Sequence, residues 1–110
     1  MIEIRYKTDM VKEGRVFELT ISGHANYADK GKDIVCAGVS ALTIALIHTL
    51  NDMKDNDKAK IEIDVDVGHT KINSLSRIYT DILEAESAYN TVLRGFKHIA
   101  KEYPQNVKIM

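Results

Sequence analysis

The chain contains a single cysteine, Cys36, so it cannot form an internal disulfide. Small secreted domains usually carry several disulfides, because their cores are too small to keep them folded without help. The N-terminal residues 1–7 alternate between apolar and charged types and lack the unbroken apolar stretch of a signal peptide. We therefore expect a protein of the cytoplasm.

The chain also lacks a surplus of charge. Fifteen basic and sixteen acidic residues leave a formal net charge of −1 at pH 7, whereas nucleic-acid-binding domains usually show a basic surplus or stripe. The longest apolar run, residues 34–50, is interrupted by hydroxyl and imidazole side chains and is short for a membrane span. We expect no membrane partner and no strong nucleic-acid binding. The fifteen basic residues could still form a local patch that makes weak contacts with nucleic acid.

Neither a linker nor an internal repeat divides the sequence, so we expect one domain over residues 1–110. Apolar and polar residues alternate over residues 2–7, 15–22 and 60–67, which predicts half-buried strands. The polar stretch 9–14 ends in glycine and predicts the connection of a hairpin between the first two strands.

Two segments are predicted to form helices. Residues 34–53 are apolar on nearly all sides, so this helix is expected to form the buried centre of the domain. Gly38 and Ala41 would let another element pack closely against it. Apolar residues recur at helical spacing from about residue 80, and Pro104 ends this second helix.

Residues 69–75 and 106–110 are predicted to form two further short strands. The strands therefore pair as hairpins and do not alternate with helices along the whole chain. This order favours an α+β fold: a two-layer sandwich with a largely antiparallel sheet of about four to five strands and two main helices.

Cys36 lies in the first turn of the first predicted helix. The helix dipole at that position favours a thiolate. Backbone N–H groups there lack partners within the helix and could hold the oxyanion of a tetrahedral intermediate. One interpretation is therefore a nucleophilic thiol, and the other is a buried structural cysteine that packs as a small hydrophobe.

His24 follows a predicted strand and stands a short loop before Cys36. As a general base it would take the thiol proton and return it to the leaving amine. Alternatively, it is only a polar residue at the end of a strand. His48 is expected to be a satisfied core residue, and His69 and His98 to lie in a turn and on a helix surface. No histidine pairs with Cys36 at a spacing typical of zinc ligands, so we expect no metal and no cofactor.

Asp33 is a good N-cap for the helix, because its carboxylate can accept from the backbone N–H of Val35 or Cys36. Alternatively, it orients His24 as a third catalytic member. Ser40 stands one helical turn after Cys36, so its hydroxyl could reach the same site or the loop. The alternative for Ser40 is a hydrogen bond back to a helix carbonyl.

The segment between His24 and Asp33 is polar, contains a glycine and has no periodicity. We expect a mobile loop that becomes ordered over substrate. Its residues are Ala25, Asn26, Tyr27, Ala28, Asp29, Lys30, Gly31 and Lys32.

Two motifs stand close together: Gly-His-Ala at residues 23–25 and Gly-Lys-Asp-Ile-Val-Cys-Ala-Gly-Val-Ser-Ala at residues 31–41. Over residues 22–42 the chain resembles the ribosomal-processing cysteine protease family Prp. The length and the order of elements match that family over the whole chain. Two motifs at this separation are far more specific than a lone cysteine and histidine. Signatures of papain-like and caspase-like enzymes are absent.

The resemblance implies that His24 and Cys36 form a catalytic dyad and that the loop between them orders over substrate. It also implies a homodimer. The implied substrate is a precursor of large-subunit ribosomal protein twenty-seven, from which the family removes a short N-terminal extension during ribosome assembly. Residues 26–28 stand where the family loop varies, so the resemblance does not carry over the loop's contacts with substrate.

Two functions of other classes compete with proteolysis. A non-catalytic ribosome-associated binding module would form a complex with the precursor without shortening it. A thiol redox sensor would need a second cysteine to resolve a sulfenic acid within the chain, and the sequence has none.

Overall fold

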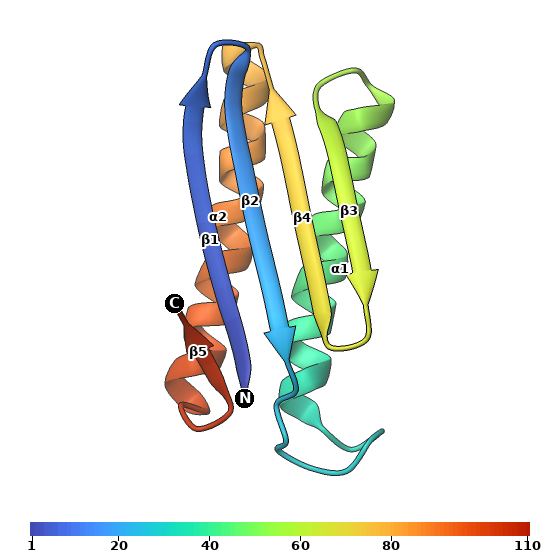
Figure 1. The fold of residues 1–110 in the computed structure, drawn as a ribbon, viewed down its shortest axis with the longest axis vertical. Helices are drawn as coiled ribbons and strands as arrows, with labels where there is room; N and C mark the ends of the chain where they lie inside the picture. The colour runs from blue at the N-terminus through green and yellow to red at the C-terminus, as the bar shows by residue number, and fades with distance from the viewer.

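The computed structural model describes residues 1–110 as one sheet with two helices on one of its faces (Figure 1). The elements along the chain are β1 (Ile2–Val11), β2 (Gly14–Gly23), α1 (Ile34–Asp55), β3 (Lys60–Asp66), β4 (His69–Ser76), α2 (Tyr79–Glu102) and β5 (Val107–Ile109). The strands lie in the order β3-β4-β2-β1-β5, and every neighbouring pair is antiparallel except β1 with β5. The predicted α+β two-layer fold with a largely antiparallel sheet is confirmed.

The β1–β2 hairpin is longer than the sequence indicates. The predicted hairpin is confirmed, but Val11 pairs with Gly14, so its turn contains only Lys12 and Glu13 and the predicted connection over residues 9–14 is too long. The far half of β1 is exposed, so no alternation of buried side chains marks it in the sequence. Its backbone pairing with β2 keeps that half extended.

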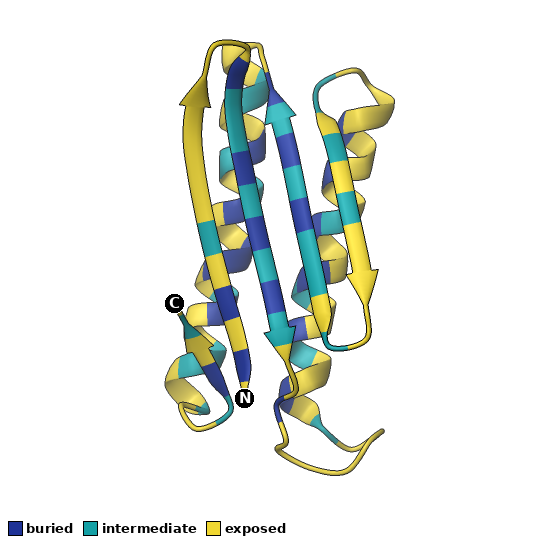
Figure 2. Ribbon diagram, viewed as in Figure 1, coloured by how far each residue is buried: buried dark blue, intermediate teal, exposed yellow.

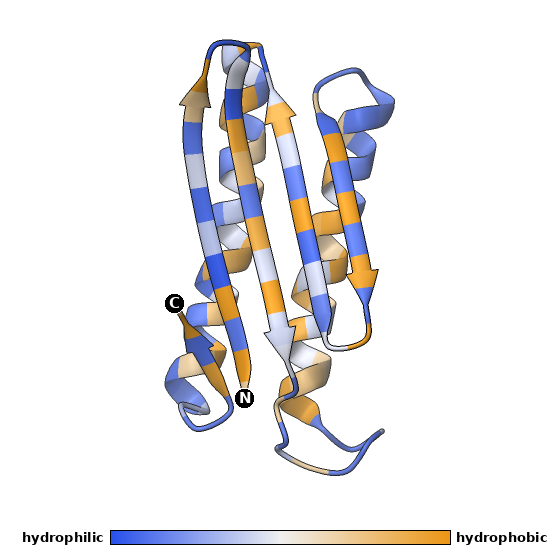
Figure 3. Cartoon of the chain, viewed as in Figure 1, coloured by the Kyte–Doolittle hydropathy of each residue, from blue (hydrophilic) through white to orange (hydrophobic).

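The core lies between the sheet and the helices. Along β2 the buried side chains alternate with less buried ones (Figure 2), and the strands show a matching alternation of hydropathy (Figure 3). Each large apolar side chain that is fully buried contributes roughly 1.5–3 kcal/mol relative to its exposed state. The fully buried residues include Ile4, Phe17, Leu19, Leu46, Leu50, Ile72, Tyr89 and Phe96.

Helix α1 is not the buried centre that its composition predicts. Its inner face packs on the sheet, but Ile44 is 52% exposed, and His48 is exposed where a core histidine was expected. In a two-layer fold the sheet covers a helix from one side only, so an apolar residue can still face solvent. By length and composition alone α1 could cross a membrane, a test that core helices of soluble proteins also pass.

The two helices pack closely where glycines leave room. A Cβ on Gly38 would lie 3.2 Å from Cδ1 of Ile99, and one on Gly95 would lie 2.6 Å from Cδ1 of Leu42. The close approach predicted at Gly38 is therefore confirmed, whereas Ala41 is exposed. This contact fixes α1 against α2 and helps to hold the first turn of α1 in place.

Candidate active site

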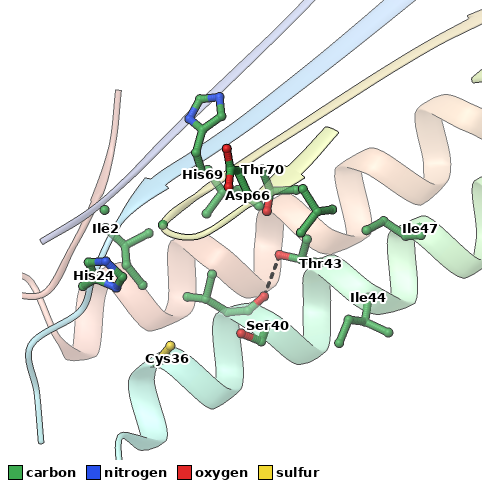
Figure 4. Close-up of a pocket in the computed structure, with 15 residues that line it drawn as sticks. Ile2, His24, Cys36, Ser40, Thr43, Ile44, Ile47, Asp66, His69 and Thr70 are labelled. Atoms are coloured by element: carbon green, nitrogen blue, oxygen red, sulfur yellow. Dashed lines mark hydrogen bonds between the residues drawn. The ribbon is translucent and has the colours of Figure 1, made fainter. Parts of the chain in front are cut away.

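A groove of about 400 Å³ opens beside the N-terminal half of α1 (Figure 4). Helix α1 forms one wall. The first residue of β1, the end of β2 and the β3–β4 turn line the other side. Residues of this groove include His24, Cys36, Ser40, Ile44, Val65 and His69.

Cys36 is the third residue of α1, and its exposed side chain lines the groove. The alternative of a buried structural cysteine is therefore wrong. The helix starts here because Asp33 caps it: Oδ1 of Asp33 accepts from the backbone N–H of Cys36 at 2.9 Å. The N-cap predicted from the sequence is confirmed.

Two backbone N–H groups at the start of α1 already have acceptors. The N–H of Cys36 donates to the Asp33 carboxylate, and the N–H of Ala37 donates to the Asp33 carbonyl oxygen at 3.0 Å. The expectation that unpaired N–H groups here could hold an oxyanion is therefore wrong for these two residues, because both groups already donate to Asp33.

Ser40 stands one turn after Cys36 and also lines the groove (Figure 4). Three threonines of the helices, at positions 43, 49 and 91, donate back to the carbonyl oxygen four residues earlier. The Ser40 hydroxyl instead adds a hydrogen-bond donor to the wall that carries the thiol.

His24 directly follows β2 and belongs to no strand. Gly23 turns the chain there with φ +94°, a conformation that side chains rarely allow. The His24 side chain is exposed and lines the same groove as Cys36 (Figure 4). The fold thus brings to one groove the two residues that the sequence pairs as base and nucleophile.

The β3–β4 turn supports the imidazole of His24. A Cβ on Gly68 would lie 3.0 Å from Nε2 and 3.3 Å from Cε1 of His24, so the ring rests against the Gly68 backbone. The Gly68 carbonyl oxygen also accepts from the Gly23 N–H at 2.8 Å. Local sequence marks Gly68 only as a residue that permits a turn, because nothing local shows that β4 pairs with β2.

Both carboxylate oxygens of Asp33 accept from the backbone. Oδ1 bonds Cys36, and Oδ2 accepts from the N–H of Tyr27 at 3.1 Å. These hydrogen bonds, with Cys36 contributing most, hold the pKa of the Asp33 carboxyl below its usual range. Asp33 therefore acts in this structure as a cap that also ties the loop to α1, and its side-chain hydrogen bonds go to Cys36 and Tyr27 and not to His24.

The loop over residues 25–32 is anchored where it begins. Ala25 is 2% exposed and belongs to the core, so the loop expected from its polar sequence does not include a free Ala25. The ring of Tyr27 packs edge-on against that of Tyr103, with centroids 5.2 Å apart. Residues 28–32 are exposed. Asn26 and Tyr27 are exposed as well, but Tyr27 is held by Tyr103 and by the Asp33 carboxylate. Residues 28–32 are therefore the segment that we expect to close over substrate.

Two apolar residues that sequence reasoning missed extend the groove beyond Ser40. Ile44 is 52% exposed and Val65 is 69% exposed, and both line the groove. Ile44 follows Cys36 and Ser40 at helical spacing, which is a signal that the sequence does contain. Val65 lies on β3, and only the tertiary structure brings that strand beside α1.

Comparison with known proteins agrees with this geometry. A family model described as "Cysteine protease Prp" matches residues 1–108. The "Ribosomal processing cysteine protease Prp" of Staphylococcus aureus is 31% identical over 97 residues, which cover 88% of each chain. The protein of the same name in Bacillus subtilis is 47% identical over 34 residues, which are 31% of this chain and 29% of that protein.

Solved structures show the same fold. The crystal structure of the Staphylococcus aureus protease Prp with a covalently linked product peptide matches with a TM-score of 0.74 and 31% identity, covering 99% of this chain and 97% of that chain. A protein of Streptococcus mutans matches with a TM-score of 0.67 and 25% identity, covering 99% and 91%. These matches favour a peptidase over a non-catalytic binding module. The chain belongs to the Prp family of cysteine proteases and is a cysteine peptidase.

Proposed function

We propose that this peptidase removes the short N-terminal extension of large-subunit ribosomal protein twenty-seven, with Cys36 as nucleophile and His24 as general base. One observation carries the choice of residues: the only thiol of the chain and the His24 imidazole line one groove. The Staphylococcus aureus relative is named for ribosomal processing, and one of its crystal structures contains a substrate peptide. That relationship supports the proposed substrate.

The proposed reaction has two halves. His24 takes the proton of the Cys36 thiol, and the sulfur attacks the carbonyl carbon of the scissile bond. His24 then gives the proton to the leaving amine as the C–N bond breaks, which leaves a thioester on Cys36. In the second half a water molecule loses a proton to His24 and attacks the thioester, which releases the carboxylic acid and restores the thiol.

Ser40 is the proposed side-chain donor to the substrate. The N–H groups of Cys36 and Ala37 are occupied by Asp33, so the first turn offers neither of them to a developing oxyanion. The Ser40 hydroxyl lines the groove one turn away and can donate to a carbonyl oxygen of the bound peptide. Ser40→Ala should therefore lower kcat while the fold stays intact.

The groove suits an extended peptide. Beyond Ser40 it continues along α1 between Ile44 and Val65, both apolar and partly exposed. The exposed part of the loop, residues 28–32, is proposed to fold over the peptide and exclude water from the thioester.

We also propose that the chain acts in the cytoplasm as a homodimer. Residues 34–51 of α1 contain no Lys, Arg, Asp or Glu, although Ile34 is 57% exposed and Ala41 is exposed too. An uncharged helix face can meet its own copy without repulsion between like charges. Light scattering at micromolar concentration tests the dimer. Ala41→Glu, which puts a charge on that face, should shift the mass to a monomer, and a monomeric wild-type protein would exclude the dimer.

Mass spectrometry of the purified protein with the precursor tests the substrate. The wild-type protein should shorten the precursor at one bond near its N-terminus, and Cys36→Ala should leave it whole. If the wild-type protein leaves the precursor whole but cleaves other peptides, the peptidase stands and the proposed substrate is wrong.

A further inference from the structure

We infer that Asn106 is a positioning residue for His24: its side-chain amide holds the backbone that carries the imidazole. This inference rests on the proposed function, in which His24 is the base. Asn106 lies between α2 and β5, far from His24 in the sequence.

The backbone on either side of His24 is held by other parts of the chain. His24 itself belongs to no strand, so it lacks the ladder of hydrogen bonds that fixes residues in a sheet. On the N-terminal side, the Gly23 N–H donates to the Gly68 carbonyl oxygen at 2.8 Å. On the C-terminal side, Nδ2 of Asn106 donates to the Ala25 carbonyl oxygen at 2.9 Å. The backbone of His24 is therefore fixed by one hydrogen bond at the preceding residue and one at the following residue.

Asn106 is itself well placed to act as a fixed support. Its backbone N–H donates to the Tyr103 carbonyl oxygen at 3.0 Å, and its carbonyl oxygen accepts from the Ile2 N–H at 2.8 Å. The residue thus joins the end of α2 to the start of β1. Because Ala25 is 2% exposed, solvent has little access to replace the Asn106 amide at this carbonyl.

The expected effect is on geometry at the thiol. If the Ala25 carbonyl loses its donor, the chain between Gly23 and Ala25 can shift and carry the imidazole with it. A displacement of about 1 Å in a catalytic group can cost about 10²-fold in rate. The competing view is that Asn106 only satisfies a buried carbonyl, in which case its loss lowers stability and leaves the chemistry unchanged.

Asn106→Asp is the sharpest test variant. The substitution keeps the shape of the side chain but replaces the N–H donor by an oxygen that repels the Ala25 carbonyl. Asn56→Asp is the matched control, because Nδ2 of Asn56 also donates to a backbone carbonyl, that of Asp52 at 2.8 Å, at the far end of α1. Asn106→Ala is a second variant that removes the donor without adding charge, should Asn106→Asp fail to fold.

Three measurements separate the two views. We expect Asn106→Asp to lower kcat for a cleaved peptide by about 10²-fold and to change KM by less than about threefold. Alkylation of Cys36 by iodoacetamide, which needs no substrate, should slow in parallel. The NMR signal of the His24 Cε1–H should move in the Asn106 variants. In Asn56→Asp all three should match the wild-type protein.

Folded Asn106 variants with wild-type kcat, alkylation rate and His24 signal would overturn the inference, even if their melting temperature falls. A wild-type protein that cleaves no peptide counts against the proposed function alone, since the NMR signal still reports whether Asn106 holds His24. A His24 signal that moves while kcat and alkylation stay unchanged also overturns the inference, because the displacement then has no effect on the thiol.

Discussion

Asp33 accepts a hydrogen bond from the backbone N–H of Cys36 at 2.9 Å, so the residue that caps α1 also bonds the residue proposed as nucleophile. Its second carboxylate oxygen bonds Tyr27 in the preceding loop. One side chain therefore joins the loop to the helix start that carries the thiol. This relationship leads to the first prediction.

Asp33→Ala should lower the melting temperature by the same amount throughout pH 5–8. The hydrogen bonds lower the pKa of Asp33 in the folded chain from its ordinary value of 3.8. A group with a lowered pKa contributes stability above its unfolded pKa, and that stability is lost as pH falls through the folded pKa. The difference in melting temperature from the wild-type protein should therefore shrink only in acid. A difference that varies within pH 5–8 would contradict this account.

Asp33→Asn is the control for that variant. Its amide oxygen can still cap Cys36, but an N–H₂ group faces Tyr27 if the oxygen keeps the cap. We expect a near wild-type kcat, with faster hydrogen exchange at the Tyr27 amide. A loss of kcat of about 10²-fold or more at unchanged stability would instead mean that Asp33 orients His24.

Replacing Cys36 should abolish cleavage and spare the fold. The side chain is exposed, so Cys36→Ala leaves no cavity in the core. Loss of a covalent nucleophile should lower kcat/KM for the precursor peptide by several orders of magnitude. Cys36→Ser should also be poor, because a hydroxyl ionises much less readily than a thiol. Circular dichroism checks the fold, and cleavage by purified Cys36→Ala would remove the nucleophile assignment.

His24→Ala should slow acylation and leave peptide binding nearly intact. General bases typically contribute about 10²–10⁴-fold, so a loss of kcat in that range is expected. Iodoacetamide alkylation of Cys36 at neutral pH gives a check that is independent of the peptide. The rate should fall in His24→Ala, and His48→Ala, at an exposed position of α1 that does not line the groove, is the control. Equal alkylation rates in the wild-type protein, His24→Ala and His48→Ala would mean that His24 does not activate the Cys36 thiol.

The later part of the loop should change its hydrogen exchange when a peptide binds. Amides of residues 28–31 are expected to exchange fast in the free protein, because this segment is exposed. They should slow when a non-cleavable peptide binds to Cys36→Ala. The Lys32 amide, which donates to the Asp29 carbonyl oxygen at 2.9 Å, should be slower from the start. If the amides of residues 28–31 already exchange slowly without peptide, this segment is rigid in the free protein, and the prediction that it closes over substrate is wrong.

The buried hydroxyl pair of Tyr89 and Ser74 should make the core sensitive to the loss of one partner. Their oxygens lie 2.8 Å apart, and the Tyr89 ring stacks on Phe17 with centroids 5.0 Å apart. Burial raises the pKa of Tyr89, so the pair should not titrate near neutral pH. Tyr89→Phe should destabilise the fold by about 1–3 kcal/mol, because Ser74 is left unpaired.

The double variant Tyr89→Phe with Ser74→Ala is the control for this pair. Removing both hydroxyls leaves neither position with a buried, unpaired hydroxyl, so the double variant should recover part of the stability. Urea unfolding measures Tyr89→Phe, Ser74→Ala and the double variant. Additive losses in the double variant would mean that the two hydroxyls do not depend on each other.

Much of the fold and part of the site can be predicted from local sequence patterns. Alternating apolar residues locate the strands, and Asp33 before an apolar stretch locates the start of α1 and places Cys36 in its first turn. These features can be predicted because each depends on residues only a few positions apart, through side-chain periodicity or a local hydrogen bond to the backbone. The sequence predicts the β1–β2 hairpin but makes its connection too long, because the end of β1 is held by pairing with β2 and carries no burial pattern.

Local sequence patterns predict the order of elements, the cap at Asp33 and the candidate pair of His24 and Cys36. The surroundings of these residues depend on the tertiary structure. Gly68 supports His24 because β4 pairs with β2, and Asn106 reaches Ala25 because β5 pairs with β1. The exposure of the outer face of α1 likewise depends on the two-layer fold, in which the sheet covers the helix from one side only, and not on the composition of the helix. Such contacts depend on which distant strands pair and in what register, and no residue pattern within one element specifies that choice.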